Sequence, residues 1–457
     1  MTLSNPAVAV HPRAAMPGAG ALGAAVGIGS LTLCMLAAAL PCLGQNPKIT
    51  FHGDIGTGQA YGAFSGFMAL SRYEVNLSAA RDLGRLCTAK AAYRVRVDRY
   101  LSPNTEYDFD LREAWLTCRA GDWLIDAGRQ SVVWGKADGF PVLDAVQPLD
   151  YREFLADDRQ SSRHPLAMIR VERRIGGKDF LQAIYILEKR ADVLPHLGDR
   201  FAEPWTAELT LAAEAASTGA VNDSSFSKPQ GGFKWEHNGT RLGWTANVLD
   251  SWATQPYYSL NAGSQSLLSS YYRRPGQEFV RTPGSAGSAP LLSSYYRRLL
   301  VGSSFDLQWS KWVVRGEATY LPVIYLPTPS TSVEYLKYAQ TSFVVGADRV
   351  VHEWLLSGQF FRTYFPRQAV DPANGRAQNF VTFLATRSFR QDRLKARAFA
   401  AGDATHYGVW TEMSLSYDLP RNFQVKLGGD WFRGDAGSTF GQLGNESRIK
   451  LDLKWSF

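Results

Sequence analysis

Residues 447–457 read SRIKLDLKWSF, and this stretch decides the fold class. Its apolar residues all share one parity: Ile449, Leu451, Leu453, Trp455 and Phe457. The charged residues have the other parity: Arg448, Lys450, Asp452 and Lys454. Successive side chains of a β-strand point to opposite faces, so a period of two predicts a strand. This strand has an apolar face, a charged face and an aromatic residue at its end.

The same ending resembles the C-terminal signal of bacterial outer-membrane β-barrels, in which a terminal Phe or Trp closes the last strand. The resemblance implies that Trp455 and Phe457 form an assembly signal and that the barrel-assembly machinery is a partner through this strand. It also implies that the last strand pairs with a first strand near Phe51. Outer-membrane lipid and lipopolysaccharide would be the other partners of such a barrel.

Alternation of the same kind recurs along the chain and predicts about eighteen strands, with sixteen as the alternative. The predicted strands lie near residues 49–61, 72–79, 89–98, 107–118, 123–134, 168–173, 181–188, 233–236, 241–248, 301–309, 312–320, 335–347, 354–363, 380–388, 393–399, 407–417, 423–431 and 447–457. In most of them the charged residues keep to one parity, as they would if the other face met lipid.

Short and long connections alternate between these strands. The long ones are residues 135–167, 189–231, 251–298, 322–332, 366–378 and 434–446. Outer-membrane barrels have short turns on the periplasmic side and longer loops outside. A soluble barrel gives the same alternation within strands, but not this order of connections. The predicted fold is therefore all-β, a transmembrane antiparallel up-and-down barrel, and residues 251–298 are its long extracellular loop, with LLSSYYRR occurring twice.

Composition agrees with this fold class. Aromatic residues make up 12% of the chain and there are 41 glycines, which suits a barrel with aromatic girdles and many turns. The mean hydropathy of −0.20 excludes a helical membrane bundle for the body of the chain. The formal net charge is +7.

The amino terminus differs from the rest of the sequence. Residues 20–44 carry no charge and follow Arg13, a pattern typical of a secretory signal peptide, with a permanent membrane anchor as the alternative. We therefore predict a signal peptide over residues 1–44 and a barrel over residues 45–457, located in the outer membrane of a Gram-negative cell after export across the inner membrane.

Two cysteines, Cys87 and Cys118, remain after the predicted signal peptide. They lie almost symmetrically about a predicted turn near Ser102, so antiparallel pairing would place them opposite each other. An oxidising periplasm permits a disulfide. Parity opposes it, because Cys118 shares a face with Arg112 unless a bulge intervenes. Both readings stay open.

Residues 128–167 lose the alternation: GRQSVVWGKADGFPVLDAVQPLDYREFLADDRQSSRHPLA. Their apolar content is too high for a mobile loop, so we predict that residues 135–167 form an ordered constriction loop folded into the barrel. The stretch resembles a proteobacterial family of porin-like barrels whose fifth strand ends in GRQ-x-x-x-WG before an Asp- and Pro-containing loop. It is more distantly similar to alginate-export and substrate-specific channels with eighteen strands.

Charged residues in this loop and on the neighbouring strands are the predicted selectivity site. Its members are Lys90, Arg94, Arg96, Arg112, Arg129, Lys136, Asp138, Asp144, Asp150, Arg152, Glu153, Asp157, Asp158, Arg163 and Arg170. An acidic loop facing a basic wall would select permeating solutes by sign and hydrogen bonding. The same residues could simply pair and pin the loop to the wall; the two readings carry equal weight.

These features predict a channel for passive diffusion or export of small polar solutes, with the arginines favouring anions. The alternative is a non-conducting barrel that acts as an assembly partner or surface adhesin. No phosphate loop, nucleophile elbow or metal-ligand spacing occurs, so we predict no enzyme, no cofactor and no metal. Basic residues alternate along strands and do not cluster, so nucleic acid is not a predicted partner.

Overall fold

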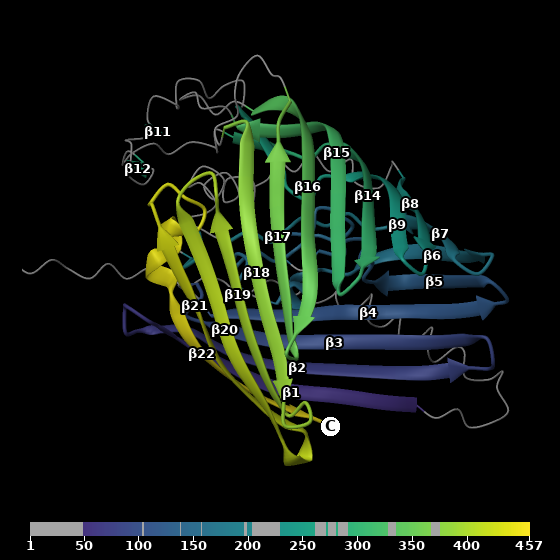
Figure 1. Cartoon of the computed structure of the whole chain (residues 1–457), viewed down its shortest axis with the longest axis horizontal. Helices are drawn as coiled ribbons and strands as arrows, with labels where there is room; N and C mark the ends of the chain where they lie inside the picture. The colour runs from purple at the N-terminus through teal and green to yellow at the C-terminus, as the bar shows by residue number, and fades with distance from the viewer. Residues whose placement is uncertain are drawn as a thin grey trace, which may run out of the picture. The chain divides into compact units, whose positions relative to one another are not determined.

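The strands of the protein lie side by side in a computed structural model, in the order of the chain (Figure 1). The structure describes residues 49–102, 105–137, 139–156, 158–195, 199–202, 229–260, 271–272, 280–281, 291–327, 335–366 and 375–457. The chain divides into two units, Met1–Lys48 and Ile49–Phe457, and the described residues belong to the second. The predicted signal peptide, residues 1–44, lies outside the described residues.

The second unit is built almost wholly from strands. The first half contains β1 Ile49–Gly62, β2 Met68–Leu83, β3 Cys87–Arg99, β4 Glu106–Ala120, β5 Trp123–Gln130, α2 Arg159–Ser162, β6 Leu166–Ile175, β7 Asp179–Ile186, β8 Gln230–Asn238 and β9 Leu242–Trp252. The second half contains β14 Arg297–Trp309, β15 Trp312–Pro327, β16 Tyr335–Val351, β17 Trp354–Tyr364, β18 Ala377–Phe389, β19 Leu394–Asp403, β20 Gly408–Leu419, η2 Pro420–Asn422, β21 Phe423–Gly434, η3 Gly441–Glu446 and β22 Arg448–Ser456. The connection between β9 and β14 contains β10 Tyr257–Leu260, β11 Tyr271–Tyr272, β12 Val280–Arg281 and β13 Leu291–Ser294.

The main sheet has 18 antiparallel strands and closes on itself. Each strand pairs with its neighbours along the chain, β9 pairs with β14, and β1 pairs with β22. The predicted all-β antiparallel barrel of about eighteen strands is confirmed. The predicted seam is also present, because Ile55 lies opposite Trp455 and Tyr61 opposite Ile449.

Side chains sort onto the two faces of the barrel wall as the alternation predicts. On β22 the large apolar residues Ile449, Leu451 and Leu453 are exposed on the outer face, while Arg448 is buried inside. The same outward exposure occurs at Tyr73, Leu77 and many other apolar residues around the wall. Within the part of the chain that the structure describes, no helix is long and apolar enough to cross a membrane.

One strand end differs from its prediction. The fifth strand was expected over residues 123–134, but β5 ends at Gln130. The chain leaves the wall there because Val132 and Trp134 turn into an apolar cluster inside the barrel. The Trp134 Nε1 donates a hydrogen bond to Gln182 Oε1 at 2.7 Å, which fixes the indole against β7. The segment that follows β5 therefore begins before residue 135.

A disulfide joins Cys87 and Cys118, which lie opposite each other in the β3–β4 ladder. The register of this ladder shifts between Ala92 and Tyr93, and Arg112 is the extra residue of the resulting β-bulge. A bulge inserts one residue into one strand and restores the facing of those beyond it. This bulge resolves the parity conflict, because Cys118 and Arg112 no longer need to share a face.

The connection between β9 and β14 contains two small antiparallel ladders, β10–β13 and β11–β12. Much of it, including most of the first LLSSYYRR copy, lies outside the described residues. The second copy ends at the start of β14, where Arg297 forms an ion pair with Asp250. Its extracellular location stays a prediction.

Candidate functional site

Residues 131–165, named here the inner segment, connect β5 to β6 through the inside of the barrel. Its first part packs in an apolar cluster with Met168, Leu249 and Leu300 of the wall. Phe140, Phe154 and Ala156 of the segment belong to or pack against a second cluster, which contains residues of β19, β20 and β21. The segment therefore contacts distant stretches of the wall and partly fills the lumen.

Glu317 of β15 holds the beginning of the inner segment. Its carboxylate accepts hydrogen bonds from four backbone N–H groups: those of Lys136, Ala137 (2.7 Å), Val142 (2.9 Å) and Leu143 (3.1 Å). Glu317 is only 4% exposed. Buried backbone donors need partners, and a carboxylate oxygen has lone pairs for several. The loop is thus folded around a side chain of the wall.

Glu153 fixes the later part of the inner segment to two strands from opposite ends of the chain, β2 and β22. Its carboxylate lies 2.5 Å from Arg72 Nη2 of β2 and 2.7 Å from Arg448 Nη2 of β22. Glu153 is 4% exposed. Burial alone would raise the pKa of Glu153, but the charges of Arg72 and Arg448 hold it below its usual range. This contact joins the segment to the barrel seam.

The short helix α2 is held by arginines of β3 and β4. Asp158 caps its start by accepting hydrogen bonds from the N–H groups of Gln160 and Ser161. Arg94 Nη1 donates to Ser161 O at 3.1 Å, Arg96 Nη2 to Ser161 Oγ at 2.6 Å, and Arg112 Nη2 to Gln160 O at 3.2 Å. Arg94 and Arg96 are 2% and 3% exposed, so these charges support the helix and have little access to the lumen.

The other predicted site residues that the structure describes also form ion pairs. Lys90 pairs with Glu113, Arg129 with Glu188, Lys136 with Asp306, Asp144 with Arg159 and Arg163, Asp150 with Arg152, and Arg170 with Asp126. Asp138 and Asp157 lie outside the described residues. No group of three or more acidic, His or Cys side chains among the described residues is arranged to hold a metal ion.

Two cavities occupy the lumen beside the inner segment. The first has a volume of about 530 Å³ and is lined by Gly58, Arg72 and Lys450 among others. The second, of about 670 Å³, is lined by Asp54, Asn76 and Ser456, which lie nearer the short-turn end of the same three strands. Gln160 of α2 lines both cavities. Helix α2 therefore borders both, and they are named here the upper cavity (the first) and the lower cavity (the second).

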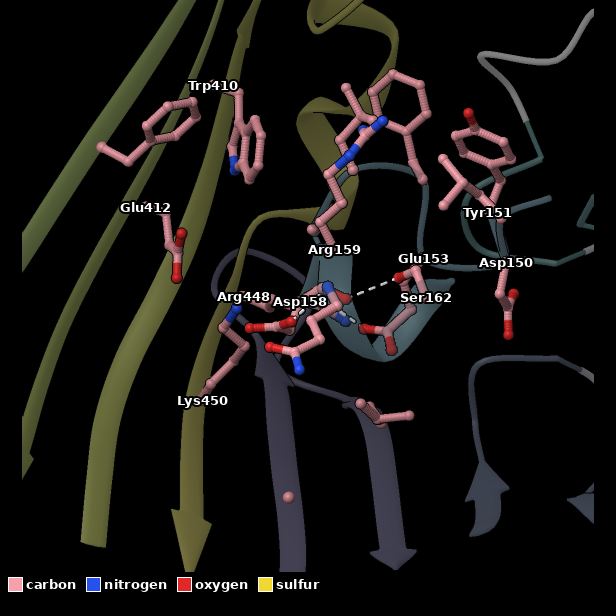
Figure 2. A pocket seen from close by; sticks show the side chains of 18 of the residues that line it. Asp150, Tyr151, Glu153, Asp158, Arg159, Ser162, Trp410, Glu412, Arg448 and Lys450 are labelled. Carbon is pink, nitrogen blue, oxygen red and sulfur yellow. Dashed lines mark hydrogen bonds and ion pairs between the residues drawn. The ribbon is translucent and has the colours of Figure 1, made fainter. Parts of the chain in front are cut away.

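The upper cavity brings the inner segment together with strands far away in sequence. Figure 2 shows Asp150, Tyr151 and Glu153 of the segment on one side and Trp410 and Glu412 of β20 on the other. Lys450 of β22 also lines it. Among the predicted residues, Asp150, Glu153 and Asp158 line the upper cavity, and Arg112 and Arg163 line the lower one.

Several lining residues were missed by sequence analysis. They lie on wall strands that are far from the inner segment in sequence: Arg72, Arg397, Phe399, Trp410, Glu412, Lys426 and Lys450. Glu317, which holds the segment but lines neither cavity, was missed as well. Parity does place the charged ones on the inner face. Nothing in the alternation shows which of the many inward charges face the segment, because that depends on strand stagger.

His164 lies buried at the end of the inner segment, with its Nδ1 4.0 Å from Asp110 Oδ2. Neither ring nitrogen makes a hydrogen bond within the described part of the chain, and the side chain is 3% exposed. Burial, aided by the charge of Arg190, lowers the pKa of His164 to about 3. The ring is therefore neutral at physiological pH.

Acidification should loosen the inner segment through His164. The pKa of His164 in the folded protein lies below the ordinary value of 6.5. The contribution of the neutral ring to the free energy of unfolding is therefore fully present above pH 6.5 and is lost as the pH falls toward 3. The loss reaches about 2 kcal/mol at pH 5. Limited proteolysis within residues 131–165 should accelerate from pH 7 to pH 5, and His164→Asn should flatten that dependence. An equal acceleration in the variant would contradict this role.

The fold and the inward segment define a porin-like β-barrel of the outer-membrane type. The chain belongs to the family described as Protein of unknown function (DUF1302), whose model matches residues 48–457. No curated protein matches the sequence.

Solved structures that match this chain over most of its length have very different sequences. OccK2 (OpdF) of Pseudomonas aeruginosa is 9% identical with a TM-score of 0.50, and the match covers 90% of this chain and 97% of that one. OccAB4 of Acinetobacter baumannii is 7% identical with a TM-score of 0.48, covering 91% and 99%. The outer membrane channel DcaP of Acinetobacter baumannii is 11% identical with a TM-score of 0.42, covering 90% and 98%. The likeness to OccK2 supports the fold and nothing finer.

Proposed function

We propose that the protein is an outer-membrane channel for passive passage of small polar solutes. The observation that carries this proposal is the pair of lumen cavities that both border α2 and share Gln160 in their lining. A closed barrel with an apolar outer face can lie in lipid, and a polar lumen can conduct solutes. The short turns would face the periplasm and the long connections the outside.

We infer only weak selectivity for the sign of a solute's charge. The predicted basic wall is largely neutralised, since Arg94 pairs with Asp108 and Arg96 with Glu74. Six basic and five acidic side chains line the upper cavity, so the charges there nearly balance. The preference for anions predicted from the sequence therefore stays a prediction, and we expect it to be small.

Planar-bilayer recording of the refolded protein tests the proposal. We expect stepwise currents after insertion, with a reversal potential close to zero in a salt gradient of potassium chloride. Absence of any steps from protein that shows the heat-modifiable migration of a folded barrel would remove the channel function and favour a non-conducting barrel.

Gln160 is expected to limit the conductance. Its side chain is exposed on α2 and lines both cavities, so replacing it changes the width of the route between them. Gln160→Ala should raise the single-channel conductance and Gln160→Trp should lower it, each by about twofold if this is the narrowest point. Gln391→Trp at the exposed turn between β18 and β19 is the matched control. Equal conductance in all three variants would place the constriction elsewhere.

A further inference from the structure

The upper cavity is lined by two chemically distinct groups of side chains. The aromatic group is Phe140 and Phe154 (with the apolar Leu155) of the inner segment, together with Phe399 and Trp410 of β19 and β20. The charged group comes from the wall and shares a strand with an aromatic residue in two cases: its members are Arg397, Glu412, Lys426, Lys450 and Asp452. A lumen that only conducts water and ions gains nothing from aromatic surface open to the cavity, because apolar surface does not stabilise hydrated ions.

The aromatic group packs against further rings. Phe140 packs against Phe380 with centroids 5.4 Å apart, and Phe154 packs against Phe440 at 6.4 Å. The rings of Phe399 and Trp410 meet edge to face at 5.2 Å. Such packing locks the side chains, so the surface they offer is preorganised for a partner.

The charged group contains side chains of both signs. Arg397 forms an ion pair with Glu412, and Lys450 lies 2.9 Å from Asp430. Lys426 lies directly opposite Asp452 across the β21–β22 ladder. Because each cation has an acidic neighbour, the charged group can hydrogen-bond a polar substituent of a solute without selecting strongly for its charge.

The cavity has the size of a small-molecule site. Its volume of about 530 Å³ falls within the range of ligand pockets, roughly 300–1,000 Å³. Such pockets combine apolar and aromatic lining with a few polar groups that orient the ligand. The aromatic group and the charged group together meet both requirements in one cavity.

We propose that the upper cavity binds an amphipathic solute with an apolar ring system and a charged or strongly polar substituent. The ring lies against Phe140 and Phe154, and the substituent lies among Arg397, Glu412 and Lys450. Recognition of the ring dominates, and the sign of the substituent is secondary. This inference rests on the proposed channel function and names the class of solute that binds in the lumen during its passage.

Current block by three probes tests the inference on the wild-type channel. The probes are 2-naphthalenesulfonate, a trimethylammonium salt of the same ring, and methanesulfonate. Both naphthalene probes should interrupt the current reversibly, and methanesulfonate should not. Block by all three, or by the two sulfonates alone, would overturn the inference in favour of simple charge recognition. If the wild-type protein shows no conductance at all, the proposed channel function is wrong, and this outcome differs from each of the block patterns above.

Variants locate the block in the upper cavity. Phe140→Ala should weaken the apparent affinity for both naphthalene probes about tenfold, the value of one lost aromatic contact. Phe140→Leu keeps most of the volume and should weaken it less, which keeps the test usable if the alanine variant folds poorly. Phe383→Ala on β18, whose ring is exposed on the outer face, is the matched control. Unchanged affinity in both Phe140 variants would overturn the assignment.

Discussion

Replacing Glu317 by alanine is expected to release the inner segment and raise the conductance at least about twofold. The wild-type carboxylate accepts four backbone N–H groups from residues 136–143. Without the carboxylate, each buried N–H group left without a hydrogen bond would lower the stability of the segment's folded position by about 1–3 kcal/mol. We therefore expect the segment to move until water reaches these groups. Single-channel recording measures the gain in current, and limited proteolysis measures the exposure of residues 131–149.

Two further substitutions at acidic residues make this result specific. Glu317→Gln keeps the shape but offers one acceptor oxygen where the carboxylate has two, so it should lie between wild type and alanine. Glu353→Ala removes an exposed carboxylate that pairs with Arg387 at the rim and should leave both readouts unchanged. Wild-type conductance and protease resistance in Glu317→Ala would show that the apolar cluster alone holds the segment.

Phe457→Ala should lower the yield of folded barrel several-fold, and Gly53→Ala should do the same from the other side of the seam. The N–H of each residue donates to the carbonyl of the other, at 3.0 and 2.9 Å. A Cβ on Gly53 would come within 2.4 Å of the Phe457 ring, which occupies the space above the glycine. Heat-modifiable migration after refolding, and membrane insertion in cells, measure the yield.

Gly56→Ala is the control for this seam. It lies on the same strand, three residues along, and a Cβ there meets only the Leu453 carbonyl oxygen at 3.5 Å, an ordinary contact. It should assemble like the wild type. If Phe457→Ala assembles normally as well, the aromatic ring has no role in closing the barrel. The prediction that Phe457 is part of an assembly signal is then wrong.

Much of the fold could be predicted from alternation because strand formation and side-chain facing are local properties. The residues of β22 show this, since Leu451 and Trp455 face outward and Arg448 inward as their parity predicts. The end of β5 was placed wrongly because Val132 continues an apolar pattern whose partners lie inside the barrel. The disulfide stayed open for a similar reason, because only the β3–β4 register reveals the bulge at Arg112.

The candidate site was predictable in part. The inner segment, its apolar character and most of its charged residues were visible in the sequence, but their roles were not. Arg94 and Arg96 looked equally suited to selectivity and to pinning, and burial against Ser161 shows how they hold α2. Glu317 was one inward charge among many. Its partner Lys136 lies 181 residues away, beyond the reach of any local pattern.

The sequence by itself determined the barrel, the two faces of its wall and the segment that leaves it, because a period of two depends only on backbone geometry. The tertiary structure decided which wall residues meet that segment, where the two cavities lie, and that Gln160 lines both of them. Those contacts depend on strand stagger and on the path of the segment across the lumen. Both are set by packing between residues far apart in the chain.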